Sequence, residues 1–137
     1  MRVLVCGSRD WSFDQHGEII FTTLDTFNRK YPITTLIQGE CRGVDLWAKK
    51  WASIKQGIPV LGFRPNWEAK GKAAGPERNL RMIREGIGDP RHLRCQGKPD
   101  CVFAFTDDLE TSKGTKNMVT LARNEGIPVY LHGHGLL

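Results

Sequence analysis

Apolar, strand-like runs alternate along the whole chain with segments of helical periodicity, and this alternation constrains the fold more than any other feature. The first run, residues 2–6, is short and almost continuously apolar, as expected for a strand buried on both faces of a parallel sheet. The next segment places Ile20, Leu24 and Phe27 at three- and four-residue steps, with Asp14 as the expected N-cap. The change of period marks a strand followed by a helix.

The same two signals recur to the end of the chain. Further strands are expected at residues 34–38, 58–63, 101–105 and 126–131, further helices at 44–57, 76–87 and 115–125, and loops at 64–75 and 88–100. Strict alternation of this kind implies right-handed β-α-β crossovers. The sequence therefore predicts a single α/β domain over residues 1–137, a compact Rossmann-like, doubly wound parallel sheet of five strands in the order 3-2-1-4-5.

Composition and terminal sequence limit the classes of protein to consider. The chain has 39% hydrophobic and 26% charged residues, as globular domains do, and no apolar run approaches the roughly 20 residues that cross a bilayer. Residues 1–6 form a strand-like stretch without the pattern of a signal peptide. We therefore expect a cytoplasmic protein that does not bind membranes.

Neither cysteine nor histidine spacing indicates a metal site. The four cysteines form no C-x-x-C pair, so reduced thiols are expected, and Cys41 has no histidine base beside it in the sequence. His132 and His134 lack a third ligand. We expect no metal and no cofactor.

The positive charge of the chain is concentrated in one segment. Residues 64–98 hold nine Lys and Arg against four Asp and Glu, which accounts for the whole net charge of +5. Such a segment favours phosphate-bearing partners, although it can also be a solvated face that keeps the protein soluble. Single-stranded nucleic acid is the last-ranked partner, because no basic run is continuous.

Polar loops rich in small residues follow three of the expected strands, at residues 7–11, 39–45 and 106–115. In open parallel sheets, ligands bind beyond the carboxyl ends of the strands. The run Ser112-Lys113-Gly114-Thr115 at a helix start can cradle phosphate, or its hydroxyls can simply cap the helix. The loops match neither the dinucleotide pattern nor the P-loop pattern of nucleoside triphosphatases.

Taken in order, these motifs resemble the YspA/YpsA-related branch of the SLOG superfamily. The residues that carry the resemblance are Gly7-Ser8-Arg9, Gly43-x-Asp45, Trp67, Ala74-Gly75-Pro76-x-Arg78-Asn79-x-x-Met82 and Ser112-x-Gly114-Thr115-x-x-Met118. The resemblance implies a Rossmann-like fold that handles nucleotides or nucleotide-derived ligands such as ADP-ribose. It also implies a homo-oligomer, which we expect to be a dimer.

Relatives of this branch include the Lonely-guy phosphoribohydrolases, which cleave the N-glycosidic bond of nucleoside monophosphates. Their Arg-Lys motif resembles Arg78-Asn79, and their glycine-rich motif resembles residues 111–118, with Met118 at the catalytic glutamate position. Methionine can neither stabilise an oxocarbenium ion nor activate water. The sequence therefore does not identify the catalytic residues. The candidates are Arg78, Asp45, Glu77 and Asp107.

We accordingly expect a sensor or sequestering module that binds a nucleotide or nucleotide-derived ligand, with an N-glycosidic hydrolase as the alternative. Arg9 and Arg78 would neutralise phosphate, Asp45 and Asn79 would contact ribose, and an indole would cover the base. The expected ligand-binding residues are Gly7, Ser8, Arg9, Trp11, Gly39, Gly43, Asp45, Trp67, Arg78, Asn79, Ser112, Gly114 and Thr115.

Two features depart from the family pattern. Glu40 stands where the family usually has a glycine, which would place a negative charge beside the proposed anion site. Residues 88–99 form an inserted basic loop that could be a lid, an oligomer contact or plain surface.

Overall fold

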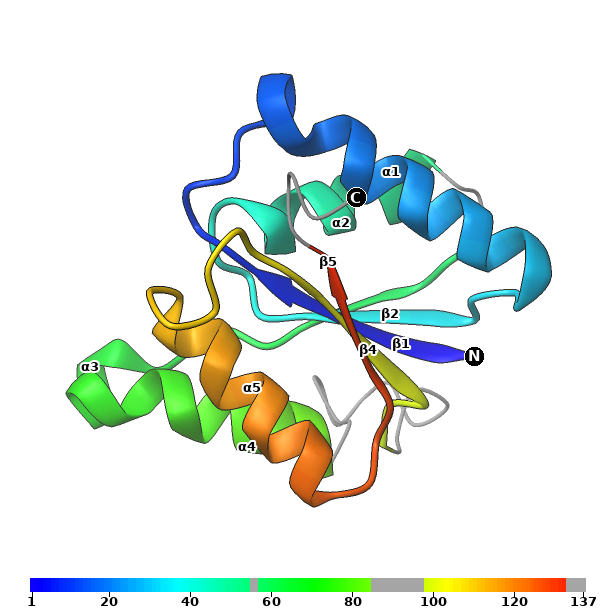
Figure 1. The fold of residues 1–137 in the computed structure, drawn as a ribbon. Coiled ribbons are helices and arrows are strands. Elements are labelled where there is room, and N and C mark those ends of the chain that lie inside the picture. The colour runs from blue at the N-terminus through cyan, green and yellow to red at the C-terminus, as the bar shows by residue number, and fades with distance from the viewer. Residues whose placement is uncertain (55–56, 85–97, 133–137) are drawn as a thin grey trace.

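The sheet is five-stranded and entirely parallel, in the order β3-β2-β1-β4-β5 (Figure 1). This computed structural model describes residues 1–54, 57–84 and 98–132. The strands are β1 (Arg2–Gly7), β2 (Thr35–Gln38), β3 (Val60–Gly62), β4 (Cys101–Phe105) and β5 (Val129–His132). The expected α/β class, parallel sheet and strand order are confirmed.

Helices cover both faces of the sheet. One layer holds α1 (Phe13–Lys30) and α2 (Val44–Ile54), and the other holds α4 (Ala74–Arg84) and α5 (Lys113–Asn124) (Figure 1). Successive residues of β1 supply the two cores: Val3 packs in the cluster that contains Leu24 and Trp51, and Leu4 packs in the cluster that contains Ile83. This alternation explains the continuously apolar sequence of β1.

Several element boundaries differ from expectation. Ser12, rather than Asp14, is the N-cap of α1, because its Oγ accepts a hydrogen bond from the Gln15 N–H at 3.4 Å. The expected loop at 64–75 contains α3 (Trp67–Lys70) and a 3-10 turn, η1 (Gly71–Ala73).

The helix expected from Pro76 starts earlier, at Ala74. Proline is accommodated because first-turn N–H groups have no partner within a helix. Likewise, α5 begins at Lys113 rather than Thr115.

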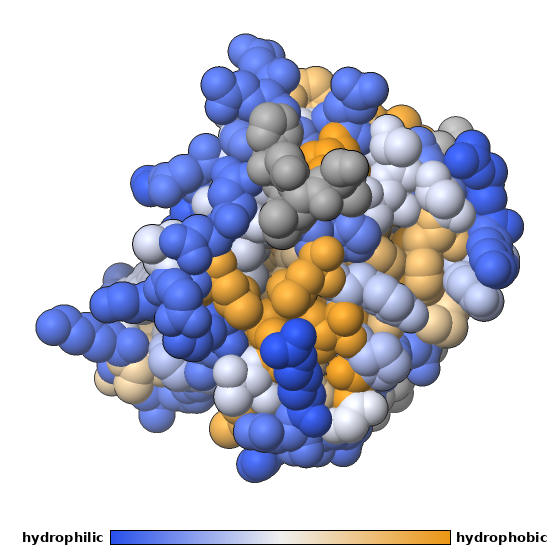
Figure 2. All heavy atoms as spheres, viewed as in Figure 1, coloured by the Kyte–Doolittle hydropathy of each residue, from blue (hydrophilic) through white to orange (hydrophobic). Residues whose placement is uncertain are grey.

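The strand β5 forms one edge of the sheet, and apolar side chains gather over it in the view of Figure 2, with hydrophilic residues around them. Its Tyr130 and Leu131 are exposed. Within the described residues, no helix combines the length and apolar character that a bilayer crossing requires. The basic loop expected at 88–99, apart from its last two residues, lies outside the described residues, as do Cys95 and His134.

Candidate functional site

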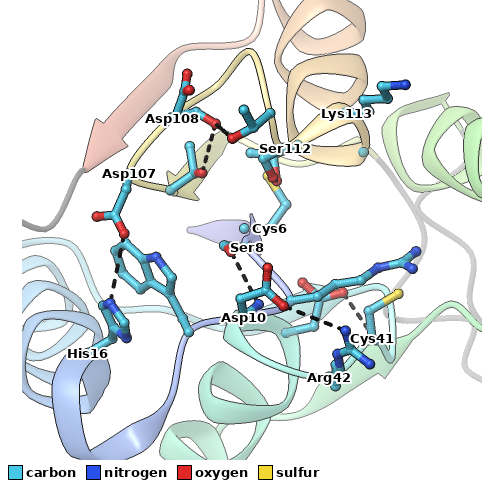
Figure 3. Close-up of a pocket in the computed structure, with 18 of the residues that line it drawn as sticks. Cys6, Ser8, Asp10, His16, Cys41, Arg42, Asp107, Asp108, Ser112 and Lys113 are labelled. Atoms are coloured by element: carbon cyan, nitrogen blue, oxygen red, sulfur yellow. Dashed lines mark hydrogen bonds and ion pairs between the residues drawn. The ribbon is translucent and has the colours of Figure 1, made fainter.

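A cavity of about 820 Å³ opens beyond the carboxyl ends of β1 and β4, where the strand order reverses (Figure 3). Such a reversal point is the usual ligand site of an open parallel sheet. Of the expected ligand-binding residues, those that line the cavity are Gly7, Ser8, Arg9, Trp11, Asp45, Arg78, Asn79, Ser112, Gly114 and Thr115. The catalytic candidate Asp107 also lines it.

Four other candidates are not part of the cavity lining: Gly39, Gly43, Trp67 and Glu77. Gly43 has φ of 82°, and a Cβ there would collide with the carbonyl oxygen of Ser8, so glycine is required where two loops touch. Glu77 pairs instead with Lys70, Oε2 to Nζ at 3.5 Å. The exposed ring of Trp67 lies against Arg9, whose Cζ is 5.9 Å from the ring centroid.

Arg78 is only 6% exposed and connects α4 to the ends of two strands. Its Nη1 donates to the carbonyl oxygens of Gly39 and Phe63, the latter at 3.2 Å, and its Nε donates to Asn79 Oδ1 at 2.9 Å. A Cβ on Gly39 would collide with the guanidinium. Cys41 Sγ is 3.7 Å from Nη1. These contacts fix the guanidinium in the inner wall of the cavity.

Asp45, at the start of α2, is the buried acid beside Arg78. Its Oδ2 accepts hydrogen bonds from the backbone N–H groups of Gly39 at 3.2 Å and Cys41 at 3.3 Å. Burial raises the pKa of Asp45 from 3.8 to about 6, while the charge of Arg78 and these two hydrogen bonds oppose that rise. The carboxylate thus orders the loop between β2 and α2.

Asn79 connects the same wall to the start of α5. Its Nδ2 donates to the Gly114 carbonyl at 3.2 Å and to Asn117 Oδ1 at 3.0 Å. Ser112 Oγ is 2.7 Å from Thr115 Oγ1, whereas a Cβ on Gly114 would meet no atom within 4 Å. The first turn of α5 therefore borders open space, and the backbone N–H groups of a first turn favour anions.

The sequence interpretation did not single out His16, which is 6% exposed and lines the cavity. Its ring stacks on Trp11 with centroids 4.4 Å apart, and its Nε2 is 3.9 Å from Asp107 Oδ2. One signal was available: His16 precedes Ile20 and Leu24 by steps of four, so it lies on the sheet-facing side of α1 at the end nearest the loops.

Charged side chains of both signs line the cavity. His16, Asp107 and Asp108 lie on one side, and Arg42 and Lys113 lie on the other. The basic lining residues are Arg9, Arg42, Arg78 and Lys113, and the acidic ones are Asp10, Asp45, Asp107 and Asp108. Opposite charges are also neighbours in the lining, because Asp10 pairs with Arg42 at 3.6 Å. Among the described residues, no group of three or more His, Cys, Asp or Glu is placed to hold a metal ion.

Residues 1–69 match the family described as YspA, cpYpsA-related SLOG. Over 139 residues the chain is also 32% identical to the Gene 61 protein of Mycobacterium phage D29, with 96% of each chain covered. The chain belongs to this SLOG family. No solved structure matches it significantly.

Two positions expected from the sequence to depart from related patterns lie away from the cavity lining of this SLOG-family chain. Met118 of α5, which the resemblance would align with the Lonely-guy glutamate, is fully buried in the core between the sheet and the layer of α4 and α5. Glu40 does not line the cavity, and its carboxylate accepts hydrogen bonds from Gln38 Nε2 at 2.7 Å and Lys49 Nζ at 3.0 Å. The negative charge of Glu40 thus pairs with Lys49 and is not part of the cavity in which an anion is expected.

Proposed function

We propose that this SLOG-family protein binds a phosphorylated nucleotide or nucleotide-derived ligand in the cavity, as a sensor or a sequestering module. The observation that supports this most directly is the convergence of the α5 N-terminus, basic side chains and serine hydroxyls on one cavity. Its volume of about 820 Å³ falls within the usual range for small-molecule sites.

The phosphate would lie against the first turn of α5. Gly114 leaves open space there, and Ser8 offers a hydroxyl donor from another loop that lines the cavity, whereas the Ser112 hydroxyl donates to Thr115 Oγ1 at 2.7 Å. Arg9 and Lys113 are exposed at the same cavity and would supply positive charge. Arg78 would contribute from within the wall, by holding the loop after β2 in place.

The binding proposal is tested by calorimetry with adenine and guanine mononucleotides, their cyclic forms and ADP-ribose. At least one should bind more tightly than about 1 mM, the weak end of the affinity scale. Arg9→Ala should weaken that binding by about tenfold to a hundredfold, the value of a hydrogen bond to a charged group.

Arg29→Ala, which alters an exposed arginine at the far end of α1, is the matched control and should leave affinity unchanged. If no compound binds, or if the two arginine variants behave alike, the binding proposal is wrong.

A hydrolase that cleaves an N-glycosidic bond is the second candidate, because Asp107 presents a carboxylate in the cavity although Met118 does not. We expect binding without such turnover. The measurement is chromatography of free base after incubation with nucleoside monophosphates. Release well above that of heat-killed protein, lost in Asp107→Asn, would establish hydrolysis instead.

A further inference from the structure

The outer edge of β5 is an open strand edge with exposed apolar side chains. On one side β5 pairs with β4, and no described strand pairs with its other side. Tyr130 and Leu131 are 45% and 44% exposed. The segment 126–132, which contains β5, has no Asp, Glu, Lys or Arg. Proteins usually protect an exposed strand edge with charged side chains or with a covering element, so this edge is suited to pairing with another strand.

The opposite edge of the sheet, β3, is built differently. β3 follows Pro59 directly and ends in Gly62. Its Leu61 is buried, and its Val60 packs against the core cluster that contains residues of α2. Of the two edges of the described sheet, it is therefore the β5 edge that presents exposed apolar side chains.

The backbone groups on the open side of β5 belong to Val129 and Leu131. Pro128 and His132 face β4, because their carbonyl oxygens accept N–H groups from β4 and from the residue after it, at 2.9 and 3.0 Å. The polar groups of successive residues in a strand point to alternate sides. Val129 and Leu131 therefore turn their N–H and C=O groups outward, where a further strand can bond to them.

A second copy of β5 fits this edge when the two strands run antiparallel about a two-fold axis. Val129 of one copy then bonds to Leu131 of the other, and the symmetry repeats the pair. This register places Tyr130 opposite Tyr130 in a pair without mutual backbone bonds, whose Cα atoms are about 4.5 Å apart. The ring of Tyr130 is supported from within its own copy, with its centroid 5.1 Å from that of Phe103. Aromatic cross-strand pairs of this kind stabilise a sheet.

The charges at the two ends of β5 favour the antiparallel arrangement. Asp107 and Asp108 directly follow Thr106, whose N–H donates to the His132 carbonyl at the carboxyl end of β5. Basic side chains outnumber acidic ones at the amino end, where the charged residues are Arg2, Arg84, Lys98, Asp100, Arg123 and Glu125. Antiparallel pairing brings the acidic end of one strand to the basic end of the other, so the two copies are complementary in charge.

We propose that this chain forms a two-fold homodimer by antiparallel pairing of β5 with β5, which joins the two sheets into one. The apolar side chains over β5 in Figure 2 form the centre of the interface, and the hydrophilic residues around them form its rim. The strand has 4 residues, so the interface is at the small end of the range for specific association, and a dissociation constant of about 1–50 μM is expected. The dimer does not depend on the ligand proposed for the cavity.

Sedimentation of the full chain tests the interface. Wild type should be mainly dimeric at about 100 μM. Tyr130→Lys places two ammonium groups opposite each other at the two-fold axis, and it should weaken the dimer by at least about tenfold. Ile54→Lys is the matched control, because Ile54 is 60% exposed and lies on α2, and this variant should dimerise as wild type does. Circular dichroism checks that each variant is folded.

The register is tested by cross-linking. Tyr130→Cys should form a covalent dimer on mild oxidation faster than the wild type does, because the expected Cα separation suits a disulfide. Leu131→Cys is the matched control, since Leu131 faces Val129 of the other copy rather than its own equivalent. Its cross-linking should be slower than that of Tyr130→Cys. This comparison also decides the matter if Tyr130→Lys does not fold.

Three results would overturn the proposal. A wild-type monomer at about 100 μM would mean that the edge does not pair with a second copy and is left to a strand of another protein. A dimer that persists in folded Tyr130→Lys would place the interface on another face. Cross-linking of Leu131→Cys that equals or exceeds that of Tyr130→Cys would contradict the antiparallel register.

Discussion

The inner wall of the cavity and its outer rim carry similar charged groups but use them differently. In the inner wall, Arg78 and Asp45 are buried, and their polar atoms bond to strand ends and loop backbone. At the rim, Arg9 and Lys113 are exposed, and Arg9 lies against the ring of Trp67. The inner charges maintain the shape of the cavity, and the rim charges are available to a ligand.

Loss of an inner charge and loss of a rim charge should both weaken binding, but for different reasons. Loss of an inner charge leaves polar groups buried without partners, which lowers stability and thereby binding. Loss of a rim charge would remove a contact to the proposed ligand and leave the fold intact, because exposed ion pairs contribute little to stability. Stability and affinity must therefore be measured on the same variants.

The largest expected effect is a loss of folding stability in the Arg78→Ala variant. Removal of the guanidinium leaves the carbonyls of Gly39 and Phe63 without their donor and the charge of Asp45 without its buried partner. Unfolding free energy should fall by about 3–5 kcal/mol, as when one member of a buried pair is removed. Urea unfolding followed by circular dichroism measures this. Arg9→Ala should stay within about 1 kcal/mol of wild type, and equal losses in the two variants would refute the distinction between wall and rim.

The next effect is a pH dependence of stability that comes from Asp45. Because its pKa is raised from 3.8 to about 6 in the folded protein, the folded state binds the Asp45 proton more tightly than the unfolded state does. This contribution is complete below about pH 4, is lost as pH rises to 6 and is constant above that, with a total on the order of 3 kcal/mol.

Asp45→Asn cannot ionise and should lack this component. The measurement is urea unfolding of both proteins at pH 4.5 and pH 7, and the quantity of interest is the difference between their pH dependences. Asparagine keeps an oxygen acceptor for the N–H groups of Gly39 and Cys41, so the substituted loop retains its geometry. An identical pH dependence in the two proteins would show that Asp45 is not the titrating group.

The fold could be predicted from the sequence because each strand and helix carries its own period, and the order of signals determines the connections. The candidate site residues could be placed at the carboxyl-end edge of the sheet because they follow the predicted strands in the sequence. The contacts that these side chains make at that edge could not be predicted. The partners of Arg78 are backbone carbonyls, which every residue possesses, so no side-chain pattern marks them. His16 was missed because its place beside Asp107 depends on how α1 packs on the sheet.

The smallest expected effect concerns Trp67, and it tests how firmly the rim is organised. The ring of Trp67 lies 5.9 Å from Arg9 Cζ, at a distance where a cation and an aromatic face attract each other by about 0.5–1 kcal/mol at an exposed site. If this contact orients Arg9 toward the cavity, Trp67→Leu should weaken binding of the tightest nucleotide about two- to fivefold, while Trp67→Phe should retain most of the affinity. Calorimetry on the two variants, alone and combined with Arg9→Ala, shows whether Trp67 acts through Arg9 or contacts the ligand itself. The loss should disappear when Arg9 is absent, whereas a loss that persists without Arg9 would mean that the indole contacts the ligand directly, as a stacking surface for the base.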